Sequence, residues 1–220
     1  MTTFLSIGSG PGISLATAER FAREGFRIVF SARDAAKTRS LAESVKAKGY
    51  EADALTVDAG DPSSVASLIA DVERGFGGVG VLHYNAASMR KAAITDQPRD
   101  TFNGDLAVNI GGALAAIQAV FPSMRQRGSG SILLTGGGYS LKPSPDYLTL
   151  SIGKAGIRAL AYALFESFAG EGVHVATVTV SSAVTPASSE VDEVAERFWR
   201  LHRQPKGEWG AEDKYLPGAE

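Results

Sequence analysis

The sequence predicts an α/β fold in which a parallel sheet is covered by helices on both faces. Short apolar runs rich in β-branched residues alternate with longer stretches whose apolar residues recur at helical spacing. Glycines cluster where several of the apolar runs end, which is typical of turns that lead from a strand into a helix. Because strands and helices alternate, we expect right-handed crossovers and a doubly wound sheet in one domain, residues 1–220.

Each element follows from this alternation. The expected strands are Thr3–Ile7, Arg27–Ser31, Glu51–Val57, Gly80–Tyr84, Ser131–Thr135 and Val173–Val180. The expected helices span about 11–24, 34–48, 62–74, 99–125, 147–169 and 188–202. Asp61-Pro62 combines a capping side chain with a proline suited to the first helical turn. Gly25 and Gly49 follow helical stretches, where a left-handed C-terminal cap favours glycine.

The C-terminal region 183–220 is expected to form a divergent loop, a helix and a tail. Its polar segment 185–192 is the best candidate for a flexible loop. The stretch Gln204–Glu220 has little periodicity, so we expect no further strand there.

Composition excludes several classes of protein. A net charge of −2 without a Lys/Arg cluster argues against nucleic-acid binding. The absence of cysteine excludes disulfides, thiolate metal ligands and a Cys nucleophile, and the histidines and carboxylates show no metal-ligand spacing. His83 and His174 lie within strand patterns, so we expect core histidines. No uninterrupted apolar run approaches the ~18 residues of a membrane span, and no signal peptide precedes the first strand pattern, so we expect a cytoplasmic protein.

The run Gly8-Ser9-Gly10-Pro11-Gly12-Ile13-Ser14 joins the first expected strand to the first expected helix. A glycine turn in this position lets backbone N–H groups approach a pyrophosphate, with the positive end of the helix dipole behind them. The turn therefore predicts a dinucleotide site of the Rossmann type, with Gly8, Gly10, Gly12 and Ile13 as cofactor-binding residues. A simple tight turn is the alternative.

With Gly8 and Gly12 in its first two places, this turn resembles the Gly-x-x-x-Gly-x-Gly turn of the short-chain dehydrogenase/reductase family. Ser14 stands at the third glycine, where we expect its small side chain to be tolerated with at most a slight loosening of helix–strand packing. Val57-Asp58-Ala59 resembles the family segment that contacts adenine, with Asp58 as acceptor and Ala59 beside it. Asn85-Ala86-Ala87 resembles the family's Asn-Ala-Gly turn, which implies that Asn85 and Ala86 bind the cofactor. The resemblance covers residues 3–182.

The end of the second expected strand indicates which dinucleotide binds. An NAD site commonly offers an acid there to the ribose 2′-hydroxyl, whereas an NADP site offers Arg to the 2′-phosphate. Ala32 stands at the position of the acid, and Arg33 follows it. This pattern resembles NADP-preferring members of the family, so we expect NADPH to be preferred over NADH. An exposed Arg that merely opens a helix is the alternative.

The resemblance implies a catalytic set of Asn, Ser, Tyr and Lys, of which two are present. Asn109 and Lys154 match the family's Asn and Lys. Leu150 lies four residues before Lys154, where the family has Tyr, and Gly137 replaces the family's Ser. Tyr and Lys four residues apart share one helix face, so that the ammonium lowers the pKa of the phenol. Leucine and glycine transfer no proton.

Neighbouring side chains are candidates for a replacement donor. Tyr139 comes first, with Ser140 beside it, because both follow the glycine run after the fifth expected strand. Tyr147 would lie about 10 Å along a helix axis from Lys154, too far for direct coupling. Ser151 would point to another face. A surface or packing role is the alternative for each of them.

The segment Phe198–Pro205, with Trp209 and Glu212, resembles a divergent branch of uncharacterised family members that often lack the catalytic Tyr. We therefore expect an NADP(H)-binding, atypical short-chain dehydrogenase that acts as an oxidoreductase on an unknown small carbonyl or alcohol. The alternatives are a non-catalytic dinucleotide-binding sensor or scaffold, and a plain structural subunit. The family pairs the helices that carry Asn109 and Lys154, which implies a homodimer or homotetramer.

Overall fold

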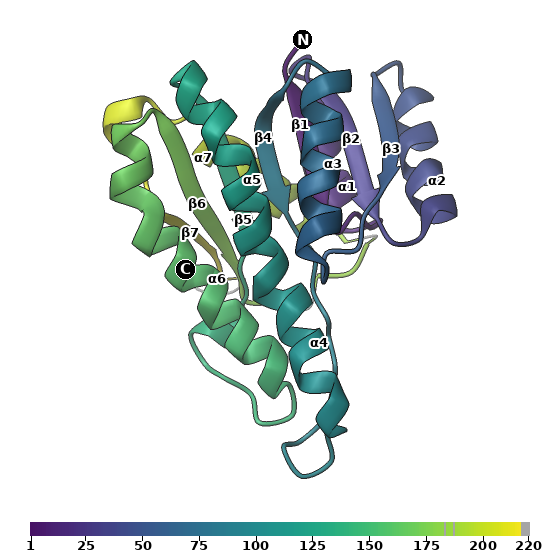
Figure 1. Ribbon diagram of the computed structural model, residues 1–220, viewed down its shortest axis with the longest axis vertical. Coiled ribbons are helices and arrows are strands. Elements are labelled where there is room, and N and C mark those ends of the chain that lie inside the picture. The colour runs from purple at the N-terminus through teal and green to yellow at the C-terminus, as the bar shows by residue number, and fades with distance from the viewer. Residues whose placement is uncertain (183, 187, 217–220) are drawn as a thin grey trace.

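The computed structural model describes residues 1–182, 184–186 and 188–216. Its seven strands form one sheet in the order β3-β2-β1-β4-β5-β6-β7 (Figure 1), and every neighbouring pair is parallel. The strands are β1 (Thr3–Ile7), β2 (Arg27–Ala32), β3 (Ala52–Thr56), β4 (Val79–Tyr84), β5 (Gly130–Thr135), β6 (Val173–Val180) and β7 (Glu212–Tyr215). The chain winds from β1 to one edge, returns to β4 and continues to the other edge, which confirms the doubly wound sheet.

Helices cover both faces of this sheet (Figure 1). One face carries α1 (Ile13–Ala22), α2 (Ala35–Lys46) and α7 (Glu190–Arg203), and the other carries α3 (Pro62–Gly75), α5 (Gly112–Arg127) and α6 (Leu148–Gly170). The helix expected at 99–125 is one helical stretch of changing pitch. It runs through a 3₁₀ turn (Arg99–Thr101), α4 (Phe102–Leu106) and a π-helical turn (Ala107–Gly111) into α5.

Local sequence signals explain several helix ends. Asp61 caps α3 by accepting a 2.9 Å hydrogen bond from Ser63 N, and Pro62 is the first helical residue. Gly25 and Gly49 follow α1 and α2 with φ of 85° and 88°. A left-handed backbone of this kind carries little strain only for glycine, so both predicted C-terminal caps are confirmed.

The strand β7 at the sheet edge corrects a sequence expectation. No strand was expected after Gln204, yet Glu212–Tyr215 pairs in parallel with β6. The Glu212 carboxylate accepts hydrogen bonds from Arg158 Nε, Tyr162 Oη and Thr179 Oγ1 at 2.9, 2.8 and 2.7 Å. The four residues Glu-Asp-Lys-Tyr show no apolar alternation, so their pattern does not predict a strand. Hydrogen bonds to side chains of α6 and β6 hold the strand instead. Residues 217–220 of the same tail lie outside the described residues.

The segment 185–192, expected as a flexible loop, is helical at its end because α7 begins at Glu190. Residue 187 of this segment lies outside the described residues. The amphipathic α7 that follows buries Val194 and Phe198 against the sheet face that it shares with α1.

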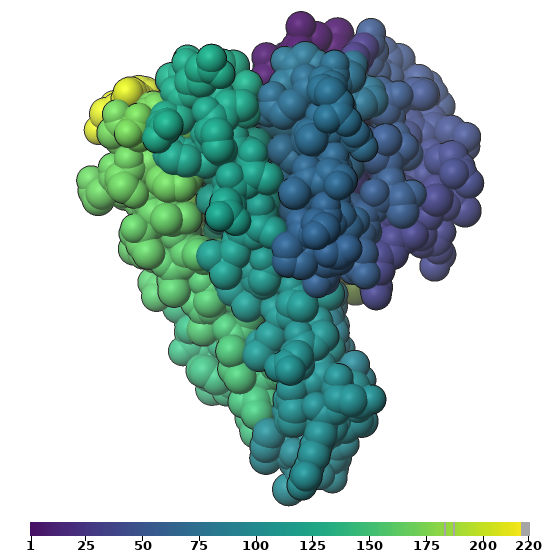
Figure 2. Space-filling view, in the orientation of Figure 1, coloured from purple at the N-terminus to yellow at the C-terminus, as the bar shows by residue number. Residues whose placement is uncertain are grey.

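The two long helical stretches on the α3, α5 and α6 face of the sheet expose apolar side chains. By length and composition, Arg99–Arg127 and Leu148–Gly170 are long and apolar enough to cross a membrane. In each of them, 33% of an apolar stretch of 18 residues is buried. In this fold both stretches cover the sheet with one side, and their lower ends extend beyond it (Figures 1 and 2). Leu114 on α5 and Ile152 on α6 are 50% and 49% exposed.

Candidate active site

The predicted site residues gather at the edge of the sheet where the strands end. Because all strands are parallel, their carboxyl ends lie at one edge, where ligands of doubly wound sheets bind. The residues that follow β1 to β5 there include Gly8, Arg33, Asp58, Asn85 and Gly137.

The glycine turn after β1 is shaped by a close approach of two chain segments. Gly8 has φ +84°, and a Cβ atom at this position would lie 2.3 Å from backbone atoms of Ala86. Only glycine fits there. At Gly10, by contrast, no atom of the described residues lies within 4 Å of a Cβ. Gly12 is the N-cap of α1 without a side-chain cap, and the first helical N–H that bonds to a described residue is that of Leu15, to Gly10 O at 3.1 Å. The earlier N–H groups of α1 have no acceptor among the described residues, as a pyrophosphate site requires.

Ser14, at the third glycine of the resemblance, is fully buried. Its hydroxyl oxygen lies 2.8 Å from the hydroxyl oxygen of Ser6 in β1. The small side chain of Ser14 is thus tolerated at this position, as expected, because it is buried and hydrogen-bonded between helix and strand.

The end of β2 presents a free cation next to an acid that is already engaged. Arg33 is exposed and forms no ion pair with any residue that the structure describes. Asp34 caps α2 by accepting hydrogen bonds from Ala36 N and Lys37 N at 3.1 and 3.0 Å. The Lys37 N–H lowers the pKa of Asp34, which stays ionised as a cap. Arg33 is therefore the residue available to a ligand at this strand end.

The ends of β3 and β4 provide the next two predicted contacts. Asp58 is exposed, and its Oδ1 accepts a 2.9 Å hydrogen bond from Gly60 N, so this carboxylate also closes the turn before α3. Ala59 next to it is buried. Asn85 Nδ2 donates to Gly8 O at 2.9 Å and thereby ties the turn after β4 to the glycine turn.

Lys154 reaches the same edge from α6. Its Nζ donates a 2.6 Å hydrogen bond to the carbonyl oxygen of Thr135, the last residue of β5. The residue keeps some exposure, but burial of the ammonium lowers the pKa of Lys154 to about 8. The group therefore exchanges its proton near neutral pH, which suits general acid–base chemistry.

The positions of the family Ser and Tyr adjoin this lysine. A Cβ atom on Gly137 would lie 3.2 Å from Lys154 Cγ, so Gly137 contacts the lysine stem directly. Leu150 is 4% exposed, one helical turn before Lys154. Gly137 therefore lies against the stem of Lys154 and Leu150 lies one turn before it on α6, and neither residue carries a hydroxyl group.

Asn109, the other retained family residue, lies in the π-helical turn before α5. Its Oδ1 accepts from Ser88 N at 2.6 Å, and its Nδ2 donates to Ser88 O and Thr149 O at 3.2 and 3.3 Å. The side chain of Asn109 therefore joins the turn after β4 to the first turn of α6, which carries Leu150.

Asp105, which the sequence analysis missed, reinforces the same joint from one turn earlier. Its carboxylate is 3% exposed. It accepts hydrogen bonds from Ser88 Oγ, Arg90 Nε, Gln97 Nε2 and Thr149 Oγ1 at 2.6, 2.8, 3.1 and 3.1 Å. Burial alone would raise the pKa of Asp105, but these donors outweigh burial and lower it. In the sequence, only the spacing of four residues between Asp105 and Asn109, which share one side of a helix, could have indicated that Asp105 belongs to the site.

A comparison with known families now decides the identity of the fold. The sequence profile described as short chain dehydrogenase matches residues 2–195 of this chain. The chain belongs to the short-chain dehydrogenase family.

One curated relative and two solved structures are similar to this chain. This short-chain dehydrogenase is 29% identical to a glucose 1-dehydrogenase of Gluconobacter oxydans over 184 residues, 83% of this chain and 69% of the relative. A metagenomic short-chain oxidoreductase in complex with NADP has a TM-score of 0.87 at 22% identity, over 98% of this chain and 97% of the other. An NAD⁺-bound xylitol dehydrogenase has a TM-score of 0.88 at 22% identity, over 99% and 98%. These two structures share the fold.

The candidate replacement donors of this short-chain dehydrogenase lie between the end of β5 and the first turn of α6. Tyr139 stacks on Tyr147 with ring centroids 5.5 Å apart. Tyr147 precedes α6 as its N-cap residue, so the distance expected for a helical position does not apply. The Ser151 hydroxyl donates to Tyr147 O at 2.8 Å and is engaged within this loop. Ser140 Oγ is buried and has no hydrogen-bond partner within the described chain.

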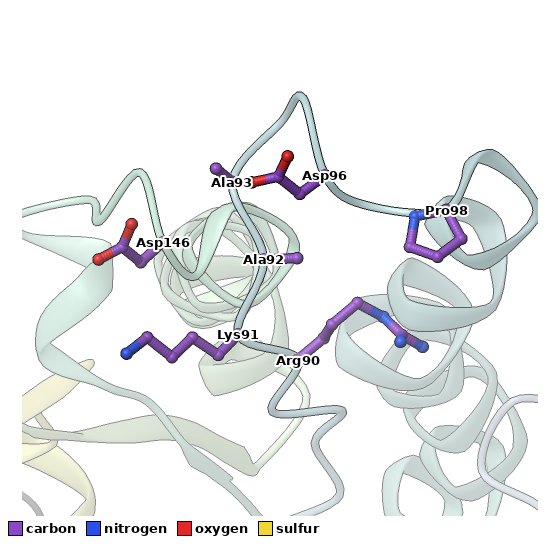
Figure 3. Close-up of a pocket in the computed structure, with 7 residues that line it drawn as sticks. All are labelled: Arg90, Lys91, Ala92, Ala93, Asp96, Pro98 and Asp146. Carbon is purple, nitrogen blue, oxygen red and sulfur yellow. The ribbon is translucent and has the colours of Figure 1, made fainter.

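A separate cavity of about 450 Å³ lies beside the loop after β4 (Figure 3). Its wall includes Arg90, Lys91, Asp96 and Asp146, and no predicted site residue lines it. Arg90 is the link to the site, because its guanidinium binds the Asp105 carboxylate.

Proposed function

We propose that this short-chain dehydrogenase binds NADP(H) along the carboxyl edge of its sheet. The observation that carries the proposal is the glycine turn, where, among the described residues, nothing crowds Gly10 and nothing accepts from the first N–H groups of α1. The pyrophosphate would bind there, and Asp58, Ala59 and the Asn85-Ala86 turn would flank the rest of the cofactor. The NADP complex of a protein with the same fold supports this choice.

Arg33 supports the phosphorylated form of the cofactor. It is an exposed cation at the end of β2, and its neighbour Asp34 is engaged as a helix cap. A guanidinium binds a 2′-phosphate through paired, charge-assisted hydrogen bonds. A protein with the same fold binds NAD⁺, so the preference of this chain rests on Arg33.

For chemistry, we propose a weak oxidoreductase activity on a small carbonyl compound or alcohol. The bound cofactor would supply or accept the hydride. Lys154 holds a proton at Nζ near neutral pH and would orient the nicotinamide ribose, while Asn109 keeps the first turn of α6 in place. Tyr139 stays the candidate for a proton donor from another position. We attribute the absence of the family Ser and Tyr to the lineage of this chain.

A non-catalytic dinucleotide sensor is the second candidate. Gly137 and Leu150 provide no proton donor at the two family positions, and this observation favours the sensor. Both candidates require cofactor binding, and only turnover separates them.

The experiment that tests cofactor binding uses Gly10. A Cβ atom at Gly10 would have no atom of the part of the chain that the structure describes within 4 Å, so Gly10→Asn and Gly10→Asp should both fold. The two side chains have nearly the same shape, but the Asp carboxylate repels a pyrophosphate. By calorimetric titration, wild type and Gly10→Asn should bind NADPH, and Gly10→Asp should lose affinity by at least about tenfold. Equal affinities for the two variants, or no binding by the wild type, would overturn the proposal.

A further inference from the structure

The central strand β4 contains a histidine that the proposed chemistry does not use. His83 is fully buried and packs between Phe4 and Phe198, with ring centroids 5.7 and 4.8 Å away. Its Nε2 lies 3.0 Å from Thr135 Oγ1, and its Nδ1 lies 3.5 Å from Ser6 Oγ. Both ring nitrogens of this buried imidazole therefore have a hydrogen-bond partner, as buried polar atoms require.

The direction of each hydrogen bond follows from one carbonyl group. Gly8 O only accepts, so the Asn85 amide must turn its NH₂ group toward it, at 2.9 Å. Asn85 Oδ1 then faces Thr135, whose hydroxyl donates its single proton to it at 3.0 Å. Thr135 Oγ1 can only accept from His83, so the proton of His83 is on Nε2.

The other side of the ring agrees with this tautomer. With its proton on Nε2, Nδ1 is an acceptor for the Ser6 hydroxyl. Ser6 in turn can accept from Ser14, whose hydroxyl oxygen is 2.8 Å away. One directed chain therefore runs from α1 through β1, β4 and β5 to the turn after β4, and each of its donors has an acceptor.

The last two side chains of this hydrogen-bond chain, Thr135 and Asn85, contact residues proposed to hold the cofactor. Asn85 holds the carbonyl group of Gly8, the glycine packed against Ala86. The hydroxyl group of Thr135 is a link in this hydrogen-bond chain, and the carbonyl oxygen of the same residue accepts the hydrogen bond from Lys154 Nζ. A displacement of Thr135 thus moves the acceptor of Lys154 and the amide that fixes Gly8.

We propose that His83 is a positioning residue for the cofactor site, which acts through Thr135 and Asn85 to set Lys154 and Gly8. The inference rests on the proposed function in taking Lys154 and Gly8 as cofactor contacts. His83 itself touches neither the cofactor nor a substrate. Its role is to supply a fixed Nε2–H donor, which no apolar side chain of the core can replace.

Variants that keep or remove this donor test the proposal. His83→Gln keeps an N–H group near the position of Nε2, whereas His83→Leu removes it. The loss of one buried hydrogen bond should weaken NADPH binding about five- to tenfold in His83→Leu, and His83→Gln should restore most of it. Thr135→Val and Thr135→Ser repeat the comparison at the next link with nearly unchanged volume, in case His83→Leu does not fold.

Val81→Ala is the matched control. Val81 lies two residues before His83 on the same face of β4, and it is equally buried. Val81→Ala should lose stability and keep its NADPH affinity. A loss of affinity in Val81→Ala equal to that in His83→Leu would overturn the proposal, since core damage alone would then explain it.

A second measurement needs no cofactor. Nitrogen NMR of the free protein should show His83 protonated on Nε2 alone, and a proton on Nδ1 would overturn the assignment. With lysine labelled at Cε, the signal of Lys154 should shift in His83→Leu and stay in place in Val81→Ala. If the wild type binds no NADPH, the proposed function fails, and the Lys154 signal still decides the role of His83: no shift in His83→Leu would refute it.

Discussion

The Nζ atom of Lys154 lies 2.6 Å from the carbonyl oxygen of Thr135, so the last residue of β5 holds this ammonium by its backbone. Burial lowers the pKa of Lys154 to about 8, which leaves most of the amine protonated at neutral pH. A catalytic phenol in the family manner would have to stand one helical turn earlier, where Leu150 is buried instead. Because Lys154 has no phenol beside it at position 150, we expect very low activity of the wild type.

Gly137→Ser together with Leu150→Tyr should raise turnover. Gly137 has an extended backbone (φ −166°) that accepts a side chain, and the stem of Lys154, 3.2 Å from a Cβ atom, must move by a few tenths of an ångström. Because positioned acid–base catalysis is worth about 10²–10⁴-fold, we expect a rise of at least about tenfold over a very low wild-type rate. NADPH oxidation with a panel of ketones, aldehydes and quinones measures it.

The control for this prediction is Gly137→Ser with Leu150→Phe, which adds the ring without the hydroxyl and should stay inactive. Robust wild-type turnover that disappears in Tyr139→Phe would show that an alternative acid exists. Tight NADPH binding without turnover in the wild type and in the double variant would favour the sensor.

NADPH should bind more tightly than NADH, and Arg33→Ala should remove most of the difference. A hydrogen bond to a charged group is worth about 1.5–3 kcal/mol, so we expect the loss of about tenfold or more in NADPH affinity and little change for NADH. The control is Arg39→Ala, which removes an exposed Arg on the neighbouring helix α2. Calorimetric titration checks this, and an equal loss for both cofactors in Arg33→Ala would contradict the assignment.

We propose a homo-oligomer, at least a dimer, formed by the apolar faces of α5 and α6. Ile152, Ala155 and Tyr162 are exposed along one side of α6, and Leu114 is exposed on α5. Large bare apolar patches mark interfaces. Light scattering after gel filtration should give a multiple of 23.0 kDa, and Ile152→Glu should give the monomer. Met89→Glu, an equally polar change at an exposed loop residue, should leave the oligomer intact. A wild-type monomer at micromolar concentration would refute the proposal.

Acid should destabilise the fold through His83. Burial, with a smaller contribution from the charge of Lys154, lowers the pKa of His83 from 6.5 to about 3. Below pH 6.5 the His83 ring is therefore protonated in the unfolded chain, whereas in the native state it stays neutral down to about pH 3. The stability contributed by the neutral ring is complete above pH 6.5 and is lost as the pH falls, by up to about 1.4 kcal/mol per pH unit.

Urea denaturation at pH 7.5, 6.0 and 5.0 measures this slope. The glutamine of His83→Gln has no proton to bind, so the free energy of unfolding of this variant should fall less between pH 7.5 and 5.0 than that of the wild type. His202, with a pKa lowered to about 4 by burial and by His174, contributes to both proteins and cancels in the comparison. Parallel slopes for the two proteins would mean that His83 titrates normally.

The sequence by itself determined the features whose causes are local. Six of the strands could be predicted as short, mostly apolar runs, because strands covered by helices on both faces bury most of their side chains. Gly8, Gly25 and the Asp61 cap follow from backbone conformations that few residue types adopt. The candidate site could be placed for the same reason, since a glycine turn after the first strand lies at the carboxyl edge of any doubly wound sheet.

Only the tertiary structure decided the features whose partners are far apart in the chain. Strand β7 depends on the hydrogen bonds of Glu212 to α6 and β6, and the clamp at Asp105 depends on donors from the loop after β4 and from α6. The sequence marked His83 only as a core residue, while the fold gave its ring a donor role between Ser6 and Thr135. A buried polar side chain is stable only with its partners in place, and spacing along the chain does not record partners that folding brings together.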